Sequence, residues 1–204
     1  MGVTMFWFLI LKSLLAAYII SHLSVSSVES YACIQKACTD KKYDPNPNTC
    51  ESSKGCFFQR QEFEDPTLHT TEQRGCSADT CTELAFSATL GRCLAFRYDR
   101  RCCFTEQCNK EPIKVSPLSS EPNGVECPAC YSGRGSVCKP VSLKCTGAET
   151  MCVNVTGRGM IISSNIQAMG CATRTACNLK NMIIMDNIKI NTSCVNGNPP
   201  LSFQ

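Results

Sequence analysis

Apolar residues form one long run at the start of the chain and only short stretches after it. The run covers residues 5–20, contains the single lysine Lys12, and leads into a more polar segment that ends at Ser30. This pattern is typical of a secretory signal peptide, and we expect cleavage after Ser30. A retained membrane-spanning anchor is the alternative, but the basic cluster that would orient it is missing. Residues 196–204 contain no apolar tail for a lipid anchor, so we expect a secreted protein without a membrane anchor.

Beyond residue 30 the alternation of apolar and polar positions predicts β-strands. Residues 151–167 alternate around Gly157-Arg158-Gly159, which indicates a turn between two strands. Residues 182–191 contain four isoleucines, and a stretch of this length favours a strand over a helix. Helix signals are weak throughout, so the pattern indicates an all-β protein.

Cysteine content changes this picture most. The chain has 18 cysteines, all of them after Ser30, a density typical of a disulfide scaffold. Secretion makes disulfides their default state. Small domains bury too little apolar surface to be stable through their cores alone, and each disulfide contributes about 2–4 kcal/mol. Disulfides therefore dominate the expected stability.

The cysteines divide the chain into two halves. Ten lie between Cys33 and Cys108, and eight lie between Cys127 and Cys194. Residues 111–124 between these groups include three prolines, three serines and a glycine, which predicts an extended linker. We therefore predict a signal peptide and two domains with a linker between them, over residues 1–30, 31–110, 111–124 and 125–204.

The two halves repeat each other. Two spaced cysteines followed by a Gly-Cys dipeptide occur in both, as Cys50, Cys56 and Gly75-Cys76 and as Cys145, Cys152 and Gly170-Cys171.

The first half ends on the motif Cys102-Cys103-x4-Cys108-Asn109. Adjacent cysteines cannot easily pair with each other. Cys103 can close the short loop to Cys108, while Cys102 must reach back to an earlier segment.

This motif and the opening Cys127-Pro128-Ala129-Cys130-Tyr131 resemble the three-finger domain of the lymphocyte-antigen and urokinase-receptor superfamily. In that domain a disulfide knot holds three β-hairpin loops. Residues 145–152, with residues 122–127 before them, are similar to the second domain of gamma-type inhibitors of secreted phospholipase A2. The resemblance covers residues 31–204 and implies an all-β, disulfide-rich fold of two tandem three-finger domains.

The resemblance also implies a disulfide pattern. It gives Cys33–Cys56, Cys50–Cys76, Cys81–Cys102, Cys103–Cys108, Cys127–Cys152, Cys130–Cys138, Cys145–Cys171 and Cys177–Cys194. Cys38 and Cys93 are left over, and we expect them to pair and to join the first and third fingers. Counting cysteines alone leaves a free pair or a shifted scheme open.

Candidates for chemistry are few. Cys127-x2-Cys130 could indicate a zinc or redox site, but structural disulfides are favoured in a secreted chain with even counts in both halves. The one histidine after Ser30 is His69, in the polar stretch 67–71, which we predict as an exposed hairpin loop. Nucleophilic catalysis needs a base beside the nucleophile. Glu62 and Glu64 alternate as on a solvated strand face. We expect no enzyme, no metal and no cofactor.

A basic cluster comprises Arg97, Arg100 and Arg101, with Phe96 and Tyr98 interleaved. Such a cluster could bind a polyanion. The formal net charge is only +3, however, and an aspartate interrupts the cluster. We therefore favour a solvated strand face and expect no nucleic-acid partner.

Asn154-Val155-Thr156 and Asn191-Thr192-Ser193 are glycosylation sequons. A glycan on Asn154 would obstruct the base of a finger and favour binding through another surface. Exposed apolar side chains are the usual anchors of protein interfaces. The candidates are Phe57, Phe58, Phe63, Met160, Ile161 and Ile162, and core packing is the alternative role for them. Phe57 and Phe58 are adjacent, so they face opposite sides of a strand and one is expected to be exposed.

The resemblance implies a secreted binding protein that inhibits secreted phospholipase A2 by covering the surface with which the enzyme meets lipid. It also implies a tendency to form homo-oligomers, which raise effective concentration. The alternative is an extracellular ligand or receptor-like module of the urokinase-receptor type that binds a cell-surface protein. A toxin-like effector shares the fold but is usually a single domain.

Overall fold

The computed structural model describes residues 30–39, 48–65, 67–91, 94–113, 117–133, 137–160, 165–185 and 187–197. The predicted signal peptide, Cys93 and the side chain of Cys38 lie outside the described residues. The pairing of Cys38 with Cys93 therefore stays a prediction.

The first half forms antiparallel strands whose bounds follow the cysteine pattern. They are β1 (Tyr31–Thr39), β2 (Asn48–Ser52), β3 (Cys56–Asp65), β4 (Thr67–Cys76), β5 (Leu84–Leu90) and β6 (Leu94–Cys103). Their order in the sheet is β5-β6-β3-β4-β1-β2. The two strands of each hairpin are therefore neighbours, and β3 lies at the centre between β4 and β6.

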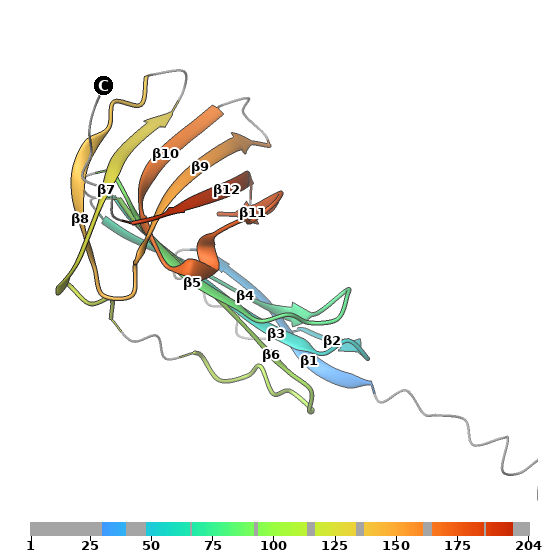
Figure 1. Cartoon of the computed structure of the whole chain (residues 1–204). Coiled ribbons are helices and arrows are strands. Elements are labelled where there is room, and N and C mark those ends of the chain that lie inside the picture. The colour runs from blue at the N-terminus through green and yellow to red at the C-terminus, as the bar shows by residue number, and fades with distance from the viewer. Residues whose placement is uncertain are drawn as a thin grey trace, which may run out of the picture.

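The second half repeats this arrangement. Its elements are β7 (Pro122–Gly133), β8 (Val141–Thr146), β9 (Met151–Gly159), β10 (Asn165–Ala172), the 3-10 turn η1 (Arg174–Ala176), β11 (Met182–Ile184) and β12 (Ile188–Asn196). The strands follow the order β11-β12-β9-β10, and β7 pairs with both β10 and β8 (Figure 1). The predicted all-β, disulfide-rich three-finger fold is confirmed.

Eight disulfides are present among the described residues. They are Cys33–Cys56, Cys50–Cys76, Cys81–Cys102, Cys103–Cys108, Cys127–Cys152, Cys130–Cys138, Cys145–Cys171 and Cys177–Cys194. These pairs coincide with the eight that the family resemblance implies.

Asn109 completes the knot of the first half. Its buried side chain donates from Nδ2 to the carbonyl oxygens of Ile34 at 2.9 Å and Phe57 at 3.0 Å. Its Oδ1 accepts from the Ile34 N–H at 2.9 Å. The Cys-Asn ending therefore ties the end of the half to β1 and β3 by hydrogen bonds as well as by disulfides.

The predicted turn at Gly157-Arg158-Gly159 is wrong, because these residues lie inside β9. Gly157 pairs with Ile166 on one side and with Ile190 on the other. A Cβ at this position would lie 3.3 Å from Ile190 and 3.4 Å from Ile166. This glycine therefore serves close side-chain packing rather than a turn.

Two further boundaries differ from expectation. The predicted single strand over residues 182–191 is divided, because Met182–Ile184 form β11 and β12 begins at Ile188. Strand β7 begins at Pro122, inside the predicted linker. The Asn123 side chain holds that start by donating to the carbonyl oxygens of Gly147 and Glu149, each at 3.0 Å.

The two halves are joined edge to edge. Strand β10 pairs with β5 through three residue pairs, Gly170 with Leu90, Cys171 with Thr89, and Ala172 with Ala88. In Figure 1 the strands of the first half, in blue to green, meet those of the second half, in yellow to red, near β5 and β10. The predicted domains therefore share one sheet.

The main core also draws on both halves. Its buried side chains are Phe86, Ala88, Leu90, Leu94, Phe96 and Tyr98 from the first half, and Val153, Val155, Ala168, Ala172, Ala176 and Ile190 from the second. The rings of Phe86 and Tyr98 stack at 5.2 Å between centroids. A smaller cluster consists of the buried Cys127, Cys145, Cys152 and Cys171. Hydrophobic burial and disulfides thus stabilise different parts of the molecule.

Candidate functional site

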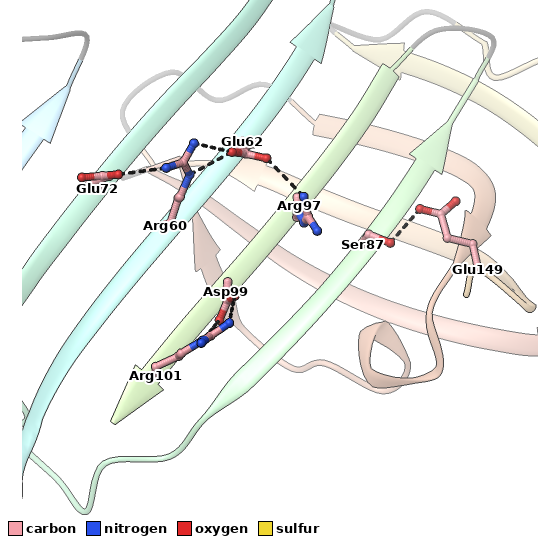
Figure 2. Close-up of polar contacts among 8 residues, drawn as sticks. All are labelled: Arg60, Glu62, Glu72, Ser87, Arg97, Asp99, Arg101 and Glu149. Atoms are coloured by element: carbon pink, nitrogen blue, oxygen red, sulfur yellow. Dashed lines mark hydrogen bonds and ion pairs between the residues drawn. The ribbon is translucent and has the colours of Figure 1, made fainter. Parts of the chain in front are cut away.

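One face of β3, β4 and β6 carries a network of paired charges, shown in Figure 2. The Arg60 guanidinium contacts Glu62 at 2.6 Å and Glu72 at 3.2 Å. Glu62 also contacts Arg97 at 3.7 Å. Glu62 is therefore paired rather than simply solvated. Ion pairs near the surface each contribute about 0–1 kcal/mol, so this network mainly satisfies its own charges.

The rings of Phe57 and Phe58 lie on opposite sides of β3, as their adjacency predicts. Phe58 is only 3% exposed, and the Arg74 guanidinium lies 4.7 Å from its ring centroid. Phe57 is half-buried, and the Arg100 guanidinium lies 4.4 Å from its centroid. Cation–π contacts therefore cover both rings, and the expectation that one is exposed does not hold.

The basic cluster does not form one surface. Arg97 and Arg101 lie on the charged face, where Arg101 pairs with Asp99 at 3.2 Å (Figure 2). Arg100 lies on the opposite face. The interleaved residues Phe96 and Tyr98 belong to the core. The expected solvated strand face is thus only partly correct.

The remaining apolar candidates have different environments. Phe63 is half-buried against the main core. Met160 is 61% exposed at the end of β9, where its N–H donates to the Asn187 carbonyl oxygen at 2.8 Å. Ile161 and Ile162 lie outside the described residues.

Met160 is part of a small exposed surface at the tip of the second half. Ile183, 47% exposed, pairs across the β11–β12 hairpin with Lys189, and Lys189 pairs with Arg158 on β9. Opposed residues of antiparallel strands share a face. We call Arg158, Met160, Ile183 and Lys189 the tip surface. Sequence reasoning missed three of these residues, because only the strand register brings them together.

The candidates for chemistry lie apart from one another. His69 is in strand β4, not in a loop, and is exposed, with Nε2 3.0 Å from the Thr67 hydroxyl. Cys127 and Cys130 are bonded to Cys152 and Cys138. Neither cysteine is therefore a free thiolate that could act as a zinc ligand or a nucleophile.

A buried carboxylate at the joint was missed by sequence reasoning. Glu149, only 3% exposed, accepts a hydrogen bond from the Ser87 hydroxyl at 2.8 Å, across the two halves (Figure 2). Burial raises the pKa of Glu149, and hydrogen bonds with Ser87 and Thr89 oppose that rise. No motif marks this residue, because only folding brings it to Ser87.

The two sequons lie side by side. Asn154 on β9 pairs with Ser193 on β12, and Asn191 on β12 pairs with Thr156 on β9. Both asparagines are half-buried. Asn154 and Arg158 are four residues apart on β9, and Lys189 and Asn191 are two residues apart on β12, so each pair lies on one face of its strand. Because Lys189 pairs with Arg158, all four side chains lie on the same face of the sheet.

Comparison with known proteins identifies the family to which this architecture belongs. A family model described as the u-PAR/Ly-6 domain matches residues 123–200. Protein RoBo-1 from Rattus norvegicus is 63% identical over 204 residues, which cover 98% of this chain and 85% of that protein. The chain belongs to the u-PAR/Ly-6 family.

More distant relatives of this u-PAR/Ly-6 protein carry functional names. A phospholipase A2 inhibitor of the gamma type from Laticauda semifasciata is 26% identical over 169 residues, covering 79% of this chain and 90% of that protein. Ly6/PLAUR domain-containing protein 8 from Bos taurus is 27% identical over 172 residues, covering 79% and 73%. Such relatives are typically non-enzymatic binding proteins, extracellular or membrane-attached. Within the described ranges, no helix has the length and apolarity needed to cross a membrane.

Proposed function

We propose that this protein is a secreted, non-enzymatic inhibitor of secreted phospholipase A2 that acts by protein–protein contact. The observation that carries the proposal is the similarity to a gamma-type inhibitor over 169 residues, a length that spans both halves. Inhibition by contact requires no nucleophile and no metal. It requires a rigid surface that covers the enzyme.

The tip surface is the best candidate for that contact. Met160 and Ile183 expose apolar atoms there, and the positively charged Lys189 lies between Ile183 and Arg158 in the strand register. Apolar anchors bordered by charge are typical of protein interfaces. By contrast, Phe57 and Phe58 are covered by arginines, so we do not expect them to act as anchors.

The sequons bear on the same surface. Asn191 lies two residues from Lys189 along β12, on the same face. A glycan on Asn191 would therefore border the tip surface and limit the size of a partner. We expect enzymatic removal of glycans from the secreted protein to strengthen binding.

A pull-down with the immobilised mature protein against a panel of secreted phospholipases, followed by hydrolysis of micellar substrate, tests the proposal. We expect stoichiometric binding with loss of hydrolysis. Met160→Asp and Ile183→Asp should weaken binding by about tenfold or more, because burying an unpaired charge is costly. Leu68→Asp is the matched control, since Leu68 is 59% exposed but lies in the first half.

The outcomes separate two candidate functions. Failure to bind any phospholipase at micromolar concentration would refute the inhibitor proposal. Binding to a phospholipase without loss of hydrolysis would also refute it. Failure to bind would favour the second candidate, an extracellular module for a cell-surface protein, which the similarity to a Ly6/PLAUR domain-containing protein supports.

A further inference from the structure

A cavity of about 300 Å³ lies between the two halves, on the core side of the shared sheet. Its lining comprises Phe63, Phe86, Ala88, Leu90, Leu94 and Phe96 from the first half, and Tyr131, Val153, Val155, Ile166, Ala168, Ala176, Ile184, Met185, Ile188, Ile190 and Thr192 from the second. Ligand sites usually fall in this range of volume, and many lie where two domains meet.

The lining contains no charged side chain among the described residues. The Thr192 hydroxyl is already engaged, since it donates to the Ala176 carbonyl oxygen at 2.5 Å and accepts from the Leu179 N–H at 2.9 Å. The cavity thus offers little to water and many van der Waals partners to hydrocarbon. Apolar cavities of about half this volume in other proteins stay dry and bind small hydrocarbons.

The lining residues differ in size and exposure, which distinguishes a buried floor from a partly exposed rim. Ala88, Ala168 and Ala176 are all buried, and their methyl groups leave space at the floor. Tyr131 is 47% exposed at the rim, and Met185 is half-buried there. An elongated apolar group could therefore enter end-on and keep a polar head group in solvent.

A second contact joins the two halves beside the cavity. The Met185 N–H donates to Oε1 of the buried Gln61 at 2.7 Å. Gln61 is in β3 and Met185 follows β11, and five strands separate β3 from β11 in the sheet order. The sheet must therefore curl to bring them together, and the cavity exists only while both halves remain joined.

From these observations we propose that the cavity binds the hydrocarbon chain of a monoacyl lipid. A methylene group needs roughly the 30 Å³ that a water molecule occupies in the liquid, so about ten fit. The proposal does not depend on phospholipase inhibition. The chain could come from a free fatty acid or from a lysophospholipid, which share this chemistry.

Fluorescence titration of the mature, oxidised protein with dansyl-undecanoate tests the proposal. We expect saturable binding with one probe per chain, displaced by laurate and not by butyrate. Competition by lauroyl-lysophosphatidylcholine distinguishes the sources: equal competition means that the head group is ignored, and stronger competition by either compound identifies the preferred source.

Ala88→Leu and Ala168→Leu place three additional carbons in the cavity, so each should weaken probe binding by about tenfold or more. Ala95→Leu is the matched control, because Ala95 precedes the lining residue Phe96 on β6 but points to the opposite face. Its affinity should stay within about twofold of wild type.

Several results would overturn the proposal. They are a lack of saturable binding, equal displacement by butyrate and laurate, and equal affinity in the cavity variants and the Ala95 control. Near-ultraviolet circular dichroism confirms folding of each variant. If neither cavity variant folds, the chain-length series on the wild-type protein decides the question by itself.

Discussion

Gly170→Ala is the sharpest test of how the two halves are joined. The sequence repeats the dipeptide Gly-Cys at Gly75-Cys76 and Gly170-Cys171, yet the two glycines have different surroundings. A Cβ on Gly170 would collide with the Thr89 carbonyl oxygen and would lie 3.0 Å from the Leu90 Cα. Both atoms are backbone, so no side-chain rotation relieves the clash, and β5 must move away from β10.

The expected loss follows from that joint. Strands β5 and β10 share three residue pairs. A net contribution of about 1 kcal/mol for each backbone hydrogen bond gives a loss of about 2–3 kcal/mol if the pairing opens. For a protein of this length, that loss lowers the melting temperature by about 4–12 °C.

Gly75→Ala is the matched control with the opposite expectation. Its Cβ would lie 3.4 Å from the Phe57 ring, an ordinary van der Waals contact. Among the described glycines, neither Gly75 nor Gly170 has a left-handed φ, so backbone strain does not distinguish them. Replacing Gly75 should stabilise the fold by about 0.4–1 kcal/mol, because alanine reduces the entropy of the unfolded chain.

Thermal unfolding of both variants with intact disulfides, followed by circular dichroism, measures the difference. We expect Gly170→Ala to melt earlier than wild type and Gly75→Ala to melt at the same temperature or later. A Gly170→Ala protein that melts with the wild type would refute the proposed joint. Equal losses in both variants would show that the glycines matter for a reason common to the repeat.

Three further predictions concern buried polar groups. Asn109→Ala removes three hydrogen bonds of the knot and should cost about 2–4 kcal/mol in denaturant unfolding; an unchanged midpoint contradicts the role given to it. Because burial raises the folded-state pKa of Glu149, its contribution to stability is present below the unfolded pKa and is lost as pH rises through the folded pKa. Glu149→Gln keeps the Ser87 hydrogen bond and removes the titrating carboxyl, so the stability of the variant should not fall with rising pH as that of the wild type does. A stability difference between variant and wild type that is the same at every pH argues against this role of Glu149. Gln61→Leu leaves the Met185 N–H without its acceptor and should lower the free energy of unfolding by about 1–3 kcal/mol. A variant that melts at the same temperature as the wild type would contradict this.

Local signals predicted much of the fold. Short apolar stretches indicated an all-β protein and the repeated cysteine pattern indicated two similar halves, and strands in the same order make up both halves. The Cys-Cys-x4-Cys-Asn ending indicated a knot, and Cys103 pairs with Cys108 across that short loop. Such features depend on residues that are close in sequence.

The candidate site was less predictable, because it depends on neighbours far apart in sequence. Its apolar character made Phe57 a candidate anchor, but in the folded protein Arg100 lies over its ring. Met160 was found from its apolar character, whereas Ile183 and Lys189 required the pairing of β11 with β12. A side chain's exposure is set by what packs on it, and no local pattern contains that information.

The amino-acid sequence alone determined the class of protein, the division into two halves and the pairing expected from its family. The first two properties follow from the period of apolar residues and from the grouping of the cysteines, whereas the pairing came only from the resemblance to a family. Tertiary structure decided that β5 and β10 join the halves, that Glu149 is buried at this joint, and that an apolar cavity lies between them. Each of these depends on contacts between strands from different halves, which form only when the two halves pack against each other.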